Sequence, residues 1–294
     1  MSSPGVGSCL RIIRLLLTGA LLAGCGSMTR LAYNQADDLV YWWLDSYVDF
    51  NGQQSTRARD ELAALQKWHR GTQLPLYADF LKKLQPLVSQ DISEAEACAL
   101  ADEARTLLMA ASTQAEPAVL WLAGSLVPDQ ITHLKRKYDK NNEAYGREWR
   151  SLPASELRTK RIKQARERSE LLYGKLGREQ VAVIAAAVDA SVWDSQAAQT
   201  ERLRRQSDIV QTLGKIAADK PAAAELQPMM RALLERSINS PNPSYRANQA
   251  AQWHEACASF SRVHNSTTPE QRARALQTLR DYEATLRLLA AQKG

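Results

Sequence analysis

Apolar side chains recur every three or four residues through nearly all of the chain after residue 35. The clearest case is the last stretch, where the apolar positions are Ala273, Leu276, Leu279, Tyr282, Leu286 and Leu289. This spacing forms one stripe along an α-helix, whereas alternating runs typical of a β-strand are lacking. We therefore expect an all-α protein, a multi-helix array or bundle with short connections.

Breakers and capping residues divide this pattern into helices. The first expected helix carries Leu39, Trp42, Trp43 and Tyr47 on one face and ends at the Asn51-Gly52 pair. We expect further helices over 53–70 with Gly71 as the C-terminal stop, from Leu74-Pro75 onward, and from the Ser93–Glu96 capping box to about residue 112. The helical domain should span residues 35–294, with sub-boundaries near 151–154 and 240–244, where Pro interrupts the pattern.

Four expected helix starts share a form in which a cap or breaker is followed three residues later by Gln. The glutamines are Gln54, Gln130, Gln180 and Gln271. An amide at this position can reach back to the backbone of the capping residue. Their separations of 76, 50 and 91 residues exclude a regular repeat, so four good helix caps explain the pattern.

Residues 1–24 have the plan of a secretory signal, with a basic start, a short apolar run and small residues at the end. The apolar run is too short to cross a membrane as a helix, which needs about 20 residues. Leu22-Ala23-Gly24-Cys25 resembles the lipobox of bacterial lipoproteins, which implies an acylated, palmitate-bearing Cys25 followed by a tether over 25–34. By resemblance to the sorting rules of enteric-type lipoproteins, Gly26 in place of Asp implies the outer membrane, with the protein facing the periplasm.

Two cysteines remain after the signal and the lipid anchor, Cys98 and Cys257. In an oxidising compartment they form either a disulfide that closes a very long loop or two separate buried thiols. The sequence gives no distance that decides between the two.

Several clusters suggest chemistry without completing a site. A zinc site is suggested by His254, Cys257 and His264, but no fourth ligand lies nearby in the sequence. A Trp-His pair occurs twice, at Trp68-His69 and Trp253-His254, and suits a buried Trp ring with the His side chain at the edge of the core. No nucleophile elbow or phosphate loop accompanies them. We expect no catalytic residues, metal or cofactor, and the mild net charge with a periplasmic address argues against nucleic acid.

Residues 147–168 are dense in charge, with basic side chains interspersed with Glu. The pattern suits a solvated helix face with pairs such as Lys163 and Glu167. The sharper alternative is a basic strip for anionic lipid headgroups or cell-wall polymers.

Two sets of short segments each carry a resemblance to a known family. The first set is similar to an uncharacterised family of Gram-negative lipoproteins; it comprises Tyr33-Asn34, the run from Leu39 to Tyr47, Trp68-His69-Arg70 and Leu74-Pro75-Leu76-Tyr77. This sequence has Gln73 where that family usually carries an acid. The resemblance implies an all-α fold and an envelope location, and no catalytic residues. The segments ending in Gln130 and Gln271 are similar to the Leu-Thr-x-x-Gln motif of small periplasmic chaperones of the Spy and CpxP kind.

The expected function is thus a lipid-anchored, non-catalytic binding or structural protein with a protein partner in the envelope. Trp42, Trp43, Trp68, His69 and Arg70 form the candidate binding or structural motif. One alternative is a chaperone-like or envelope-stress factor with an apolar concave face of tryptophans such as Trp42, Trp43, Trp121 or Trp193. A second alternative is an envelope-polymer hydrolase that acts through His69 or His254.

Overall fold

The computed structural model describes residues 26–292, so the expected signal and Cys25 lie outside the described residues. The described chain is built from helices and contains no strand, which confirms the all-α prediction. The α-helices are α2 (Gly26–Asn34), α3 (Ala36–Val48), α4 (Gly52–Trp68), α5 (Leu74–Leu84), α6 (Glu94–Gln114), α7 (Glu116–Ser125), α8 (Pro128–Tyr145), α9 (Ala154–Tyr173), α10 (Arg178–Asp189), α11 (Ser195–Asp219), α12 (Ala223–Ile238), α13 (Pro243–Asn265) and α14 (Pro269–Ala291). Short π-helical turns follow α4 and α8 (His69–Gln73 and Gly146–Arg150), and a 3₁₀ turn, Gln85–Ser89, follows α5.

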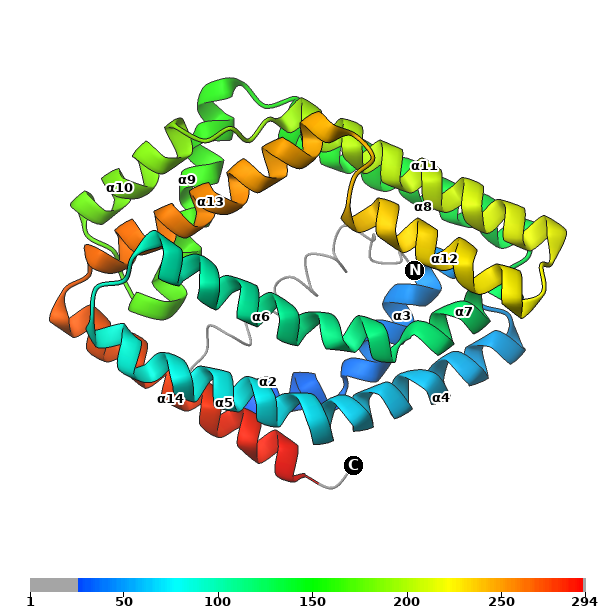
Figure 1. The fold of residues 1–294 in the computed structure, drawn as a ribbon, viewed down its shortest axis with the longest axis horizontal. Helices are drawn as coiled ribbons and strands as arrows, with labels where there is room; N and C mark the ends of the chain where they lie inside the picture. The colour runs from blue at the N-terminus through cyan, green and yellow to red at the C-terminus, as the bar shows by residue number, and fades with distance from the viewer. Residues whose placement is uncertain (1–25, 293–294) are drawn as a thin grey trace, which may run out of the picture.

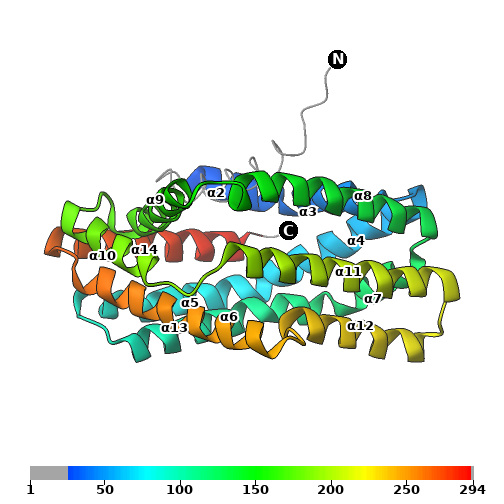
Figure 2. The same ribbon diagram turned by 90° about the horizontal axis from the view of Figure 1, so that it is seen from above.

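The helices run around the outline of a four-sided ring (Figure 1). Segments distant in sequence form its sides: α14 packs along α5, α13 along α6, α11 along α8, and α10 against α9 and α13. Seen from the edge, the ring is layered, with α2, α3, α8 and α9 at one face and α6, α7, α12 and α13 at the other (Figure 2). None of the described helices is long and apolar enough to cross a membrane.

Most predicted helix boundaries are confirmed. Side chains of Asn51, Ser93 and Thr268 cap α4, α6 and α14, and each capping box is completed by the residue three positions later. The stretches around 151–154 and 240–244 are the short connections that precede α9 and α13.

The prediction that Gly71 ends a helix is wrong. A left-handed residue usually terminates a helix, and Gly71 has no positive φ. Instead the chain passes from α4 through the π-helical turn His69–Gln73 directly into α5. The wider turn lets the chain stay helical across the glycine, and Pro75, which has no N–H to donate, falls in the first turn of α5 directly after it.

The buried core is concentrated where the helices meet at one corner of the ring. Its largest cluster includes Tyr173, Leu176, Ile184, Val263 and Leu279, which come from α9, the connection after it, α10, α13 and α14. A smaller cluster of Ile92, Ala97 and Cys257 lies between α6 and α13. There the structure joins Cys98 and Cys257 in a disulfide that spans 159 residues of sequence.

Candidate functional site

At one corner of the ring, the glutamines at the starts of α4 and α8 bind each other. Gln54 Nε2 donates to Gln130 Oε1 at 3.2 Å, and Gln130 Nε2 donates to Gln54 Oε1 at 2.7 Å. Each Oε1 also accepts the backbone N–H of its own capping residue, Asn51 or Val127. Each Nε2 donates to a backbone carbonyl on the partner segment, Ser125 or Asp49. Both side chains are buried, so their amides are paired inside the protein.

The second corner repeats this arrangement with Gln180 of α10 and Gln271 of α14. Their side chains exchange hydrogen bonds of 2.6 and 3.0 Å. Their Oε1 atoms accept the N–H groups of Gly177 and Thr268, and their Nε2 atoms donate to the carbonyls of Ser266 and Lys175.

The two corners share one geometry. In all four cases the accepting carbonyl lies two residues before the capping residue of the partner helix: Asp49, Ser125, Lys175 and Ser266. Only a side-chain amide offers one acceptor and a pair of donors together, so Gln serves where Glu cannot. The four glutamines therefore do more than cap helices: they join helix starts 76 and 91 residues apart.

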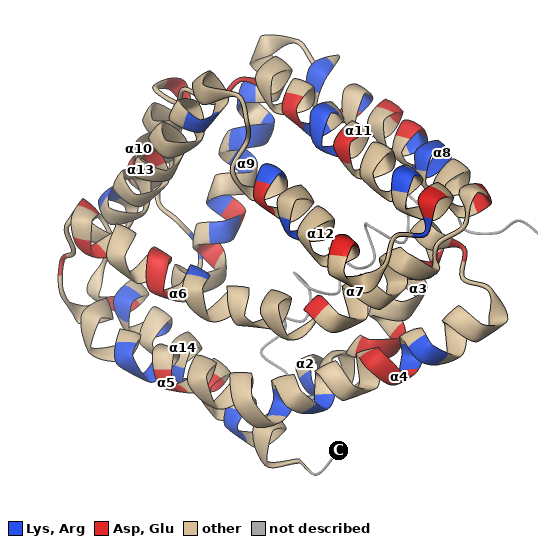
Figure 3. Ribbon diagram, turned by 45° about the vertical axis from the view of Figure 1, so that its right-hand side comes forward, with Lys and Arg blue, Asp and Glu red and all other residues tan. Residues whose placement is uncertain are grey.

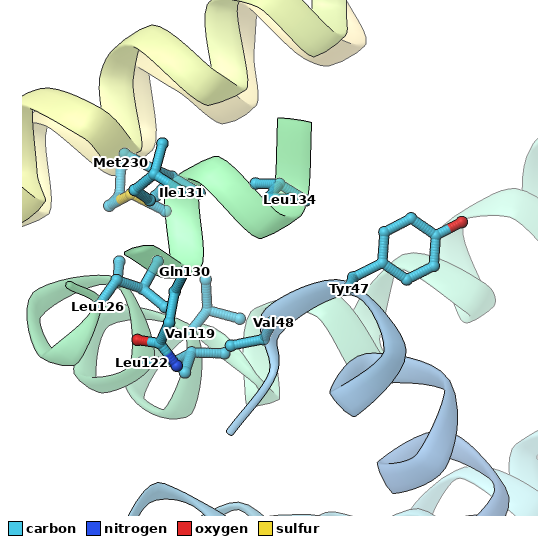
Figure 4. Close-up of a pocket in the computed structure, with 11 residues that line it drawn as sticks. Tyr47, Val48, Val119, Leu122, Leu126, Gln130, Ile131, Leu134 and Met230 are labelled. Atoms are coloured by element: carbon cyan, nitrogen blue, oxygen red, sulfur yellow. The ribbon is translucent and has the colours of Figure 1, made fainter. Parts of the chain in front are cut away.

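An apolar cavity of about 120 Å³ lies beside the Gln54–Gln130 corner. Figure 4 shows side chains from α3, α7, α8 and α12 around it, including Val48, Leu122, Leu134 and Met230. Tyr47 and Gln130 are its only polar side chains. A cavity with so few polar partners suits neither ordered water nor a polar substrate, and we interpret it as a packing gap where five helices converge.

The Trp-His-Arg motif lies at the junction of α4 and its π-helical turn, and it binds helix α2. The Tyr33 hydroxyl and His69 Nδ1 are 2.9 Å apart, and Arg70 donates to Asn34 Oδ1 at 2.9 Å. Gln66 Nε2 donates to the Tyr33 carbonyl. Arg70 also donates to the Leu289 carbonyl near the end of α14. The motif thus ties both ends of the described chain to the ring.

Burial favours the uncharged forms of Tyr33 and His69 in this cluster. Burial raises the pKa of the Tyr33 phenol to about 12, although the Arg70 guanidinium opposes the shift. Burial also lowers the pKa of His69 below its ordinary value. At neutral pH the pair is therefore a bond between a neutral phenol and a neutral imidazole, as a structural tie requires. Gln73 of the same π-helical turn is buried, and its Oε1 has no hydrogen-bond partner among residues 26–292.

A second Tyr–His pair, which the sequence did not suggest, lies in the core at the other corner. Tyr173 OH is 2.8 Å from His264 Nδ1, and His264 Nε2 is 2.7 Å from the Gln90 carbonyl. Since a carbonyl only accepts, Nε2–H donates to Gln90 and Nδ1 accepts from Tyr173. Burial lowers the pKa of His264 and raises that of Tyr173, so this pair is also neutral.

The three residues that resemble zinc ligands, His254, Cys257 and His264, have different partners in the structure and do not form one site. Cys257 is in the disulfide and His264 holds Tyr173, whereas His254 is exposed, 4.0 Å from Glu94. In the part of the chain that the structure describes, no group of three His, Cys, Asp or Glu side chains is arranged to hold a metal.

The tryptophans proposed for a concave face pack against separate partners. Arg59 lies over Tyr41 and Trp42, and Arg57 lies over Trp121. Trp193 contacts Trp149 and Arg161 at another part of the ring. Trp42 and Trp43 remain exposed on α3.

Over residues 26–292 these features define an all-helical ring in which buried amides, Tyr–His pairs and one disulfide join helices distant in sequence. A model described as a family of unknown function (DUF6279) matches residues 46–246, and the chain belongs to this family. The match confirms the resemblance to a domain of unknown function. Comparisons with curated proteins and with solved structures returned no match.

Proposed function

We propose that this protein is an outer-membrane lipoprotein, anchored through acylated Cys25, whose ring is a non-catalytic scaffold for a protein partner in the envelope. One observation carries the proposal: of the four His and Cys residues that suggested chemistry, three are engaged in joining helices, and the fourth, His254, is exposed. His69 holds α2, His264 holds α9, and Cys257 is in the disulfide between α6 and α13. Side chains that serve to hold the ring together suit a protein whose surface binds a partner.

The partner surface that we propose is the face formed by α6, α12 and α13, opposite the helix that follows the anchor (Figure 2). The three helices of this face each carry a large exposed apolar side chain: Leu108 at 65%, Leu234 at 52% and Phe260 at 44%. Exposed apolar groups on a soluble face often mark a binding site. The same side chains would also suit a chaperone that holds unfolded clients, which is our second candidate.

Photo-crosslinking in cells tests this assignment. A photoreactive amino acid in place of Leu108 or Leu234 should give one discrete adduct, and the same probe in place of Asp139 or Glu167, exposed on the other face, should not. When the crosslinked partner is then purified through its own tag, this protein should be recovered with it. A heterogeneous set of adducts would support the chaperone candidate instead, and equal adducts from both faces or none would contradict the partner surface.

A further inference from the structure

Helix α2 sets the point at which an anchored chain would leave the ring, because it begins one residue after Cys25. Its end is held by the three contacts of Tyr33 and Asn34 with α4 and the π-helical turn. In Figure 2, α2 lies at the same face as α3, α8 and α9. A chain acylated at Cys25 would therefore bring this face, rather than the opposite one, toward the lipid.

Most of the net positive charge of the protein lies on this face, and α8 and α9 supply it, since α2 and α3 together hold one basic and three acidic side chains. Residues 128–173, which comprise α8, its π-helical turn and α9, hold twelve basic and seven acidic side chains, a net charge of +5. The remainder of the chain from Cys25 onward holds 24 basic and 25 acidic side chains, so it is nearly neutral. Blue bands accordingly follow α8 and α9 in Figure 3.

Some of these cations are occupied by ion pairs. Arg158 binds Asp189, Lys160 binds Glu148, and Lys163 lies 3.8 Å from Glu167, which confirms that predicted pair. Others are exposed and have no ion pair within the described residues; they are Lys135, Arg136, Lys140, Arg147, Arg150 and Arg168. Exposed cations without a partner are the groups that an anionic surface attracts most strongly.

Aromatic side chains connect α3 to this basic surface. Trp43 is 41% exposed and its ring lies 5.1 Å from that of Tyr47. Tyr47 in turn contacts Tyr138 of α8 and accepts a hydrogen bond from Asn141. Tryptophan is enriched where proteins meet the headgroup layer of a membrane, because its ring is apolar and its N–H is polar.

We propose that the face formed by α2, α3, α8 and α9 is a membrane-docking surface for anionic phospholipid. The acyl chains of Cys25 supply attachment, and the exposed cations of α8 and α9 set the orientation of the ring on the bilayer. The face of α6, α12 and α13 then points away from the lipid. This inference rests on the lipid anchor of the proposed function.

Lysine footprinting of the full acylated protein on vesicles tests the proposal. On vesicles that contain phosphatidylglycerol, acetylation of Lys135, Lys140 and Lys163 should slow several-fold relative to phosphatidylcholine vesicles, and high salt should remove the difference. Lys83 and Lys215, on α5 and α11, should react equally on both. Free phosphate should give no protection, because the surface is proposed to recognise a lipid layer.

A matched pair of charge reversals provides the control. Lys140→Glu with Arg168→Glu should abolish the protection of Lys135 and Lys163, whereas Arg105→Glu with Arg262→Glu, on α6 and α13, changes the net charge equally and should leave it intact. If all lysines are protected equally, or if no lysine is protected although the protein stays bound to the vesicles, the docking surface is wrong. Neither of these results would contradict the lipid anchor. A protein that separates from the vesicles would contradict the anchor and, with it, this orientation.

Discussion

Removal of the Cys98–Cys257 disulfide should lower the free energy of unfolding by about 5 kcal/mol, the loop-entropy value for a closure of this length. The bond spans 159 residues of sequence and joins α6 to α13, which pack side by side. Without it the unfolded chain regains the freedom of that whole loop, while the contacts of the folded ring are retained. A loss of this size is a large part of the about 5–15 kcal/mol that stabilises an ordinary protein.

Urea denaturation with and without reductant measures this effect. Reductant should shift the midpoint of the wild-type protein strongly to lower urea and leave that of a Cys98→Ala/Cys257→Ala variant unchanged, which controls for other effects of the reagent. Coincident wild-type curves in the two conditions would show that the disulfide contributes nothing to stability.

Replacement of one glutamine at a ring corner is expected to be the next most damaging change. Gln54→Ala removes the bond to the Asn51 N–H, takes both Gln54 bonds from the buried Gln130 amide, and deprives the Ser125 carbonyl of its Gln54 donor. Loss of a helix cap costs about 1 kcal/mol and each stranded buried polar group about 1–3 kcal/mol, so the free energy of unfolding should fall by roughly 3 kcal/mol. Gln54→Glu should be nearly as harmful, because a carboxylate cannot donate to Ser125.

The exposed neighbour Gln53 provides the matched control, since Gln53→Ala removes an amide from the same helical turn and should change stability by less than about 0.5 kcal/mol. The double variant Gln54→Ala/Gln130→Ala should lose at least about 1 kcal/mol less than the sum of the single variants, because their bonds are shared. Additive losses would mean that the two glutamines act only as separate helix caps.

The contrast between caps and corners shows how far the sequence could predict this structure. Each Gln was recognisable as a capping residue because the capping interaction is local, within three residues. Its pairing was not, since Gln54 and Gln130 are brought together only when the ring closes. The same reasoning applies to the Tyr33–His69 and Tyr173–His264 pairs, whose members lie 36 and 91 residues apart.

Local signals also failed at Gly71. Gly after an apolar run is a common signal for the end of a helix, but here Gly71 lies inside a π-helical turn. The chain remains helical after this turn, and the helix that follows, α5, packs against α14. The sequence identifies Trp68, His69 and Arg70 as one motif, and in the structure His69 contacts α2 while Arg70 contacts both α2 and α14. The role of His69 as a neutral tie depends on burial, which spacing along the chain does not reveal.

Attachment at Cys25 is the central claim, because both the scaffold and the docking surface depend on it. Mass spectrometry of the intact protein purified from envelopes measures it directly. We expect a mature chain that begins at Cys25 and carries a diacylglyceryl group on its thiol with a further acyl chain on its amine. An unacylated mature N-terminus at any other residue would contradict it.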